Sequence, residues 1–311
     1  MGHFIGHERI IESLRKRILT GEISHAHIIV GEDGIGKSNL AKLIAINILG
    51  GHQDRNYVDI VNYRCKKSSF GVDDVRDVVD EVSKKPFEGD KKVIIIHDGN
   101  KMTVQAQNAL LKTIEEPPKG VFIILLCESL ELILDTIKSR CQIYKLTPLT
   151  KDEVKLYIER LGTENYSNEE IKAAISYSEG IPGKAEKFLK DSSLKDLRNL
   201  LIDLLYILVN GNLQKLLDFE VKILSYKDKK EEILNILASF IRDIIVYKEV
   251  NEINVIINGD KIENIKQLAI EMSYKKLNKI IDKIGEARKT ILSNSNFQLT
   301  IRVMLIGFME V

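Results

Sequence analysis

The chain has 311 residues, of which 44% are hydrophobic and 29% charged, a composition typical of globular proteins with about two or three domains. Its 46 basic residues nearly cancel its 45 acidic ones, leaving a formal charge of +1, which argues against gripping DNA by bulk charge alone. Three widely spaced cysteines indicate neither a disulfide framework nor a Cys-rich zinc site, and no apolar run could cross a bilayer, so we expect a cytoplasmic protein without a membrane partner.

The first half of the chain alternates short apolar runs with amphipathic segments. The runs that we expect to form strands are His27–Val30, Tyr57–Val61, Val93–Ile96 and Val121–Leu126. The segments with helical spacing are Asn39–Leu49, Val72–Lys84 and Val104–Glu115. Continuous Ile and Val runs bounded by helices are typical of strands buried on both faces, so the pattern predicts a parallel sheet in an α/β layered domain.

The strand signal nearly stops at about Thr150, where the pattern becomes helical. The runs that begin at Thr150 and Ser167 each carry a glutamate three residues later, a capping box that predicts the start of a helix. Beyond about Asp191 several long amphipathic helices are expected, with one break at Val255–Gly259. These changes predict an α/β domain over 1–148, a small helical domain over 149–192 and an all-helical domain over 193–311.

A phosphate-binding loop is predicted at Gly31–Ser38, which fits G-x-x-x-x-G-K-[ST] at every fixed position and lies between an expected strand and helix. Glycines let backbone N–H groups turn toward an anion, and the helix that follows points its positive end at the same place. Lys37 supplies a charge for the phosphates, and the Ser38 hydroxyl can ligate Mg²⁺. The nucleotide-binding residues expected here are Gly31, Gly34, Ile35, Gly36, Lys37, Ser38 and Asn39, with ATP or ADP as the ligand, with or without Mg²⁺.

The next marker is the strand Val93–Ile96, which ends in His97 and Asp98, where a Walker B strand delivers carboxylates to magnesium and water. Asp98 is therefore added to the candidate nucleotide site. Further along come the run Asn108–Pro118, with the letters NALLKTIEEPP, and the triplet Ser139–Cys141, with the letters SRC.

These last two motifs resemble the clamp-loader branch of the AAA+ ATPases, which load ring-shaped sliding clamps onto DNA. The segments Phe4–His7 and Ile23–His27 are similar to the same branch, and the clear resemblance covers roughly residues 3–190. It implies an AAA+ core, a helical lid and a C-terminal collar domain for oligomerisation. The implied partners are gamma/tau-type motor and delta subunits of DNA polymerase III, with the sliding clamp and primer-template DNA reached through the assembly.

Within that branch the chain is most similar to the delta-prime subunits, because it departs from an active motor. His97 stands where motor subunits carry a magnesium-binding aspartate, and imidazole is a poor ligand for Mg²⁺. Gly183 stands where motors carry a lid arginine, and Cys127-Glu128 replaces the usual sensor residue. Many relatives carry a four-Cys zinc module, but only Cys65 remains in that interval, so no structural zinc is expected.

The resemblance also implies that Arg140 is an arginine finger, which acts in trans on ATP held by a neighbouring motor subunit. An arginine that pairs with a nearby carboxylate in its own chain is the structural alternative. Two other functions also remain open: an active motor ATPase of the same machine, or a free-standing P-loop phosphotransferase. The acid pair Glu115-Glu116 is expected to be a solvated helix end.

Overall fold

The computed structural model describes residues 4–51, 55–65, 69–162, 166–293 and 296–309. The chain divides into two compact units, which we treat separately. Unit 1 comprises residues 1–160 and 180–183, and unit 2 comprises 161–179 and 184–311. The predicted lid, 149–192, contributes residues to both units, and the bounds of the three predicted domains stay predictions. None of the described helices combines the length and the apolar character needed to cross a membrane.

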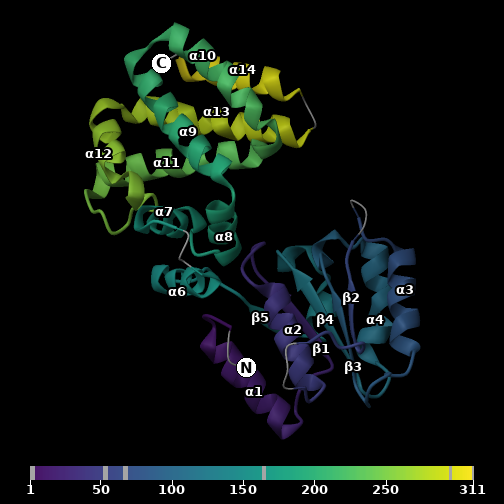
Figure 1. Ribbon diagram of the computed structural model, residues 1–311. Helices are drawn as coiled ribbons and strands as arrows, with labels where there is room; N and C mark the ends of the chain where they lie inside the picture. Colours follow the sequence, from purple (N-terminus) through teal and green to yellow (C-terminus); the bar gives the residue numbers. More distant parts are fainter. Residues whose placement is uncertain (1–3, 52–54, 66–68, 163–165, 294–295, 310–311) are drawn as a thin grey trace. The chain divides into compact units, whose positions relative to one another are not determined.

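Unit 1 is built on a five-stranded sheet whose recorded pairings are all parallel (Figure 1). Its strands are β1 (Ala26–Val30), β2 (Ile60–Tyr63), β3 (Lys92–Ile96), β4 (Val121–Cys127) and β5 (Gln142–Lys145). The order across the sheet is β2-β3-β4-β1-β5. Every residue of β1 and β3 is buried, as the continuous apolar runs predict.

Helices cover both faces of this sheet. They are α1 (Glu8–Thr20), α2 (Lys37–Ile48), α3 (Val72–Ser83), α4 (Val104–Glu115) and α5 (Asp135–Lys138), with the short helices η1 (Gly99–Lys101) and η2 (Leu130–Leu132). One core joins the sheet to α3, α4 and α5, and the other joins it to α1 and α2. In Figure 1, α2 and α3 accordingly lie on opposite sides of the strands. This arrangement confirms the predicted α/β layers.

The second strand begins three residues later than its apolar pattern predicted, because Asp59 has a different role. The Asp59 carboxylate is 2% exposed and accepts the backbone N–H groups of Phe87 and Glu88, each at 2.7 Å. Residues before Ile60 therefore form a turn that anchors the loop preceding β3. The sequence pattern did not predict the short strand β5.

Both capping boxes are present. At the start of α6 (Lys151–Leu161), Thr150 N–H donates to the Glu153 carboxylate at 2.7 Å, and Glu153 N–H donates back to the hydroxyl at 3.2 Å. The Ser167 hydroxyl and Glu170 exchange equivalent bonds at the start of α7 (Asn168–Ser178). The prediction that helices begin at these two points is confirmed.

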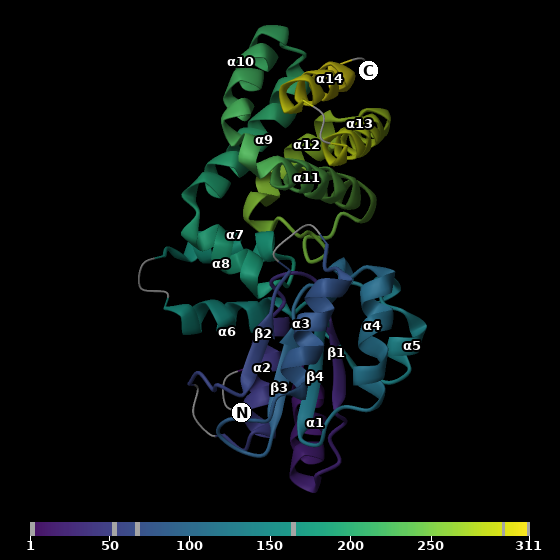
Figure 2. The same cartoon turned by 90° about the vertical axis from the view of Figure 1, so that its right-hand side faces the viewer.

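Unit 2 is helical throughout its described elements. After α7 these are α8 (Pro182–Lys190, its first two residues in unit 1), α9 (Ser192–Asn210), α10 (Leu213–Ile223), η3 (Leu224–Lys229), α11 (Lys230–Val250), η4 (Gly259–Lys261), α12 (Ile262–Glu271), α13 (Tyr274–Leu292) and α14 (Phe297–Met309). The helices α9 and α11 contact each other and each buries a long apolar face, while α13 and α14 lie side by side (Figure 2). The predicted break falls between α11 and α12.

Candidate functional site

The predicted phosphate loop joins the buried end of β1 to the start of α2, as its flanking elements require. Gly34 and Gly36 have φ angles of 81° and 109°, which side chains with a Cβ rarely adopt. Gly36 caps α2, while Ile35 is 3% exposed and anchors the loop in the core below. No acidic residue lies in the first turn of α2, so no carboxylate of the helix itself neutralises its positive end.

Lys37 opens α2 and turns back over the loop. Its Nζ donates to the carbonyl oxygens of Gly31 at 2.7 Å and Glu32 at 2.9 Å. Burial lowers the pKa of Lys37, and the nearby carboxylates of Asp33 and Glu128 oppose that change. The Lys37 ammonium is therefore held at the mouth of the loop, where an anion would meet it.

The turn after α7 packs directly on the phosphate loop. Gly183 N–H donates to the Gly34 carbonyl at 3.0 Å. A Cβ built on Gly183 would lie 2.8 Å from the Gly34 Cα, closer than real Cβ contacts come. The backbone of the loop thus occupies the space that a lid arginine at position 183 would need.

The end of β3 holds a neutral histidine beside an acid. His97 is 5% exposed, and its Nε2 lies 2.9 Å from Asn62 Oδ1 on β2. Burial lowers the pKa of His97 to about 4, so its ring is uncharged at neutral pH. Asp98 follows in a left-handed conformation with φ of 56° and lies 3.5 Å from Lys101 Nζ. One carboxylate, not two, therefore follows this strand.

The end of β4 offers no neutral polar sensor. Cys127 is 1% exposed, and burial raises the pKa of its thiol to about 11, so the thiol is protonated. Glu128 follows it, and its negative charge is among those that raise the pKa of Lys37. A triphosphate at the loop would therefore meet a like charge at the end of this strand. The sequence pattern marked Glu128 only as a replacement, not as an opposing charge.

Arg140 lies on the surface just beyond α5, with 41% of its side chain exposed. Its Nε is 2.6 Å from Glu115 Oε1, at the last residue of α4. Its Nη1 donates to the Thr136 carbonyl at 2.9 Å and to the Ser139 hydroxyl at 3.3 Å. Glu115 is 43% exposed at the end of α4, as expected for a solvated helix end. Its ion pair with Arg140 is also the structural alternative that the sequence left open for this arginine.

A second residue of α4 fixes the segment that carries Arg140. Gln107 is 2% exposed, and its amide nitrogen donates to the carbonyl of Leu132 at 2.9 Å. Its oxygen accepts the N–H of Leu134, the cap of α5, at 2.8 Å. Sequence reasoning missed Gln107, although a polar residue on the buried face of a predicted helix is a signal that could have found it.

Each unit contains a cavity of several hundred Å³ among its described residues. One, of about 410 Å³, opens beside the phosphate loop at the carboxyl ends of β1, β4 and β5, where open α/β sheets bind ligands. It is lined by Val30, Gly31, Glu32, Ile35, Glu128, Ser129, Leu130, Glu131, Lys145, Leu146, Thr147, Pro148 and Ile181.

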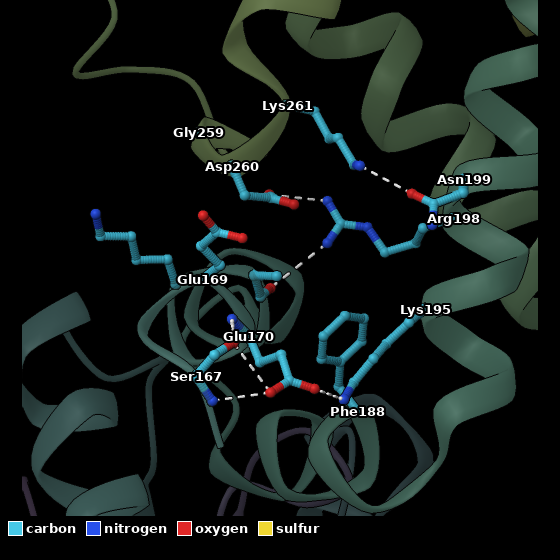
Figure 3. Close-up of a pocket in the computed structure, with 12 residues that line it drawn as sticks. Ser167, Glu169, Glu170, Phe188, Lys195, Arg198, Asn199, Gly259, Asp260 and Lys261 are labelled. Carbon is cyan, nitrogen blue, oxygen red and sulfur yellow. Dashed lines mark hydrogen bonds and ion pairs between the residues drawn. The ribbon is translucent and has the colours of Figure 1, made fainter. Parts of the chain in front are cut away.

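The other cavity, of about 630 Å³, lies within unit 2 (Figure 3). Two ion pairs line it: Lys195 with Glu170, and the 2%-exposed Arg198 with Asp260 at 3.0 Å. Arg198 also donates to the Asn258 side chain at 2.9 Å. This cavity is a structural junction that ties α9 to the segment before α12.

Candidate metal ligands are scattered over the described ranges. Among those residues, no group of three or more His, Cys, Asp or Glu side chains is placed to hold a metal ion. Cys65 and Cys141 are half-buried and form no disulfide among the described residues, and burial raises the pKa of the Cys141 thiol to about 12.

Two family models match the chain. Residues 6–150 match the model described as DNA polymerase III, delta subunit, and residues 193–310 match DNA polymerase III, delta subunit, C terminal. Together they cover most of the sequence, on both sides of the predicted lid.

Individual relatives agree with these models. The chain is 26% identical, over 98% of its length and 88% of the relative's, to DNA polymerase III subunit gamma of Buchnera aphidicola subsp. Schizaphis graminum. It is also 26% identical to subunit delta' of Bacillus subtilis, covering 93% of this chain and 92% of that one.

A solved structure shares the fold. The crystal structure of a DNA polymerase III gamma subunit-related protein from Thermotoga maritima matches with a TM-score of 0.55 at 19% identity, over 96% of this chain and 98% of the other. With the five-stranded parallel sheet and the helical C-terminal region, this likeness confirms the predicted AAA+ P-loop fold.

Proposed function

Because the chain belongs to the clamp-loader subunit family of bacterial DNA polymerase III, we propose that it serves as a stator subunit in DNA replication. In this role it binds ATP or ADP at its own phosphate loop but turns over little of it. It supplies Arg140 in trans to the nucleotide of a neighbouring gamma/tau-type motor subunit. Sliding-clamp loading onto primer-template DNA is then the work of the whole assembly.

Nucleotide binding is supported by the fit of the loop to a phosphate. Gly34 and Gly36 have the positive φ angles of an anion-binding loop, and Lys37 and Ser38 open α2. A bound Mg²⁺ would neutralise phosphate charge, with the Ser38 hydroxyl as an oxygen ligand. Asp98 follows β3 where motor subunits carry the carboxylate that acts on the attacking water, and its charge is felt by Lys37. The uncharged His97 at the neighbouring position offers no oxygen ligand, which is why little hydrolysis is expected.

The observation that carries the trans role is the surface position of Arg140. Its side chain is 41% exposed just beyond the short helix α5, and its contacts within the chain involve Nε and Nη1. A guanidinium stays charged and presents paired N–H donors that match phosphate oxygens. Arginine fingers contribute on the order of 10³–10⁵ in rate in GTPases, which sets an upper guide here.

Assembly with motor and delta subunits is supported by apolar stripes on unit 2. On α10 the exposed apolar side chains recur at every fourth position, and α14 carries a second set at helical spacing. They are Leu213, Leu217 and Val221 on α10, and Leu299, Val303 and Ile306 on α14. Exposed apolar patches of this kind are typical of protein–protein contacts, so we assign them to the collar of the assembly.

The test is the DNA-stimulated ATPase of the reconstituted loader. Arg140→Ala should lower its turnover by at least about 10-fold while leaving co-purification with the motor and delta subunits intact. Lys37→Ala should leave most turnover in place, because this chain's own site contributes little. Unchanged turnover with Arg140→Ala would refute the finger role.

The same pair of variants separates the alternatives. Loss of turnover with Lys37→Ala instead would identify an active motor subunit. A chain that sediments alone in the presence of motor and delta subunits would favour a free-standing phosphotransferase.

A further inference from the structure

The predicted finger is held by contacts from its own chain. Glu115 Oε1 lies 2.6 Å from Arg140 Nε, and it comes from the end of α4, 25 residues earlier in the sequence. The Thr136 carbonyl and the Ser139 hydroxyl accept hydrogen bonds from Nη1. The guanidinium is thus bound at two of its three nitrogens.

This arrangement leaves a defined edge for another molecule. Arginine has five N–H donors in one plane; Nη1 donates two hydrogen bonds, and Nε lies in an ion pair with Glu115. The remaining two belong to Nη2, which no recorded hydrogen bond within the described residues involves. With Nε and Nη1 engaged, the plane of the guanidinium is set before a phosphate arrives.

We propose that Glu115 is a positioning residue for Arg140: it anchors Nε so that Nη2 is presented to the γ-phosphate of the neighbouring subunit. This inference rests on the proposed function, since it requires Arg140 to act in trans. Glu115 does not touch the nucleotide, and it acts only through the arginine.

The exposure of the pair distinguishes positioning from stability. The side chains of Glu115 and Arg140 are 43% and 41% exposed, and ion pairs at such surfaces contribute little to folding. An unanchored arginine, by contrast, samples many rotamers, and each departure from the reacting geometry lowers turnover. Loss of Glu115 should therefore leave the fold intact and reduce turnover.

The experiment measures DNA-stimulated ATPase of the full reconstituted loader with Glu115→Ala, Glu115→Gln and a matched control. The matched control is Glu116→Ala. Glu116 is the C-cap residue of α4, next to Glu115, and its replacement removes the same charge. Glu115→Ala should lower kcat about 10-fold with the KM for ATP changed less than about twofold. Glu115→Gln keeps an oxygen acceptor for Nε and should recover part of the loss, and Glu116→Ala should match the wild type.

The decisive measurement is the double variant with Arg140→Ala. If Glu115 acts only through Arg140, the double variant should turn over at the same rate as Arg140→Ala alone. If the double variant turned over about 10-fold more slowly than Arg140→Ala alone, Glu115 would act independently of Arg140 and positioning would be refuted. A Glu115→Ala loader with a rate equal to or faster than that of the wild type would also refute it. If Arg140→Ala slows the loader but Glu115→Ala does not, only this inference fails. If Arg140→Ala has no effect, the proposed function fails with it.

Discussion

Replacing Gly183 with alanine tests how tightly the phosphate loop is packed. The added Cβ would lie 2.8 Å from the Gly34 Cα and 3.0 Å from the Gly34 carbonyl oxygen. Both obstacles are backbone atoms of the phosphate loop rather than a flexible side chain. The loop, or the start of α8, must therefore shift, and the Gly183 N–H bond to Gly34 must stretch.

The size of the effect expected for Gly183→Ala follows from the free-energy cost of overpacking. Forcing a methyl group into a closely packed site costs about 1–3 kcal/mol. If that cost falls on the nucleotide-bound form, in which the loop must keep its shape, affinity falls by about 5-fold to 150-fold, since about 1.4 kcal/mol is tenfold. If it falls equally on the free form, the same cost appears as lost stability.

Two measurements together capture either outcome. Titration with a fluorescent ATP analogue reports affinity, and urea unfolding reports stability. The control is Gly285→Ala in α13, where an added Cβ has no neighbour within 4 Å. This helical replacement should stabilise the chain by about 0.5–1 kcal/mol and leave binding unchanged. A Gly183→Ala protein with wild-type affinity and wild-type stability would refute the close-packing argument.

Three further predictions concern buried polar groups. Burial lowers the pKa of His27 from 6.5 to about 4. The free energy of unfolding should therefore be highest above pH 6.5 and fall by about 3 kcal/mol as the pH drops to 4, because the unfolded chain binds a proton that the folded chain does not. In His27→Phe the midpoint of urea unfolding should change less with pH over that range. Arg198→Met leaves the Asp260 carboxylate without its ion pair and should cost about 3–5 kcal/mol in the urea unfolding of unit 2. Gln107→Leu removes the acceptor for the N–H of Leu134 at the start of α5, and should lower loader ATPase while nucleotide binding by this chain stays unchanged.

Much of the core was predictable from local pattern. The short apolar runs around Ile28 and Ile94, bounded by helices, indicated strands covered on both faces, and the glycines of the phosphate loop indicated a turn before a helix. The capping boxes at Thr150 and Ser167 marked helix starts correctly, because a cap is made by residues three apart in the chain. Such signals lie within one turn or one strand, so they can be recognised without knowledge of the fold.

The features that the sequence did not predict depend on contacts between residues far apart in the chain. Asp59 looked like part of a strand, yet its carboxylate anchors Phe87 and Glu88 across 28 and 29 residues of sequence. The strand β5 is short and pairs with β1, which comes more than 100 residues earlier. Local hydrophobic periodicity carries no information about a strand partner so distant in the chain.

By itself the sequence determined the phosphate loop, the alternation of strands and helices, and the family resemblance, because these depend on residue types at short spacing. Only the tertiary structure decided that Glu115 anchors Arg140, that Asn62 holds a neutral His97, and that Gly183 lies against the phosphate loop. Each of these contacts joins residues far apart in the chain, so its energy and geometry come from packing, which a sequence pattern does not encode.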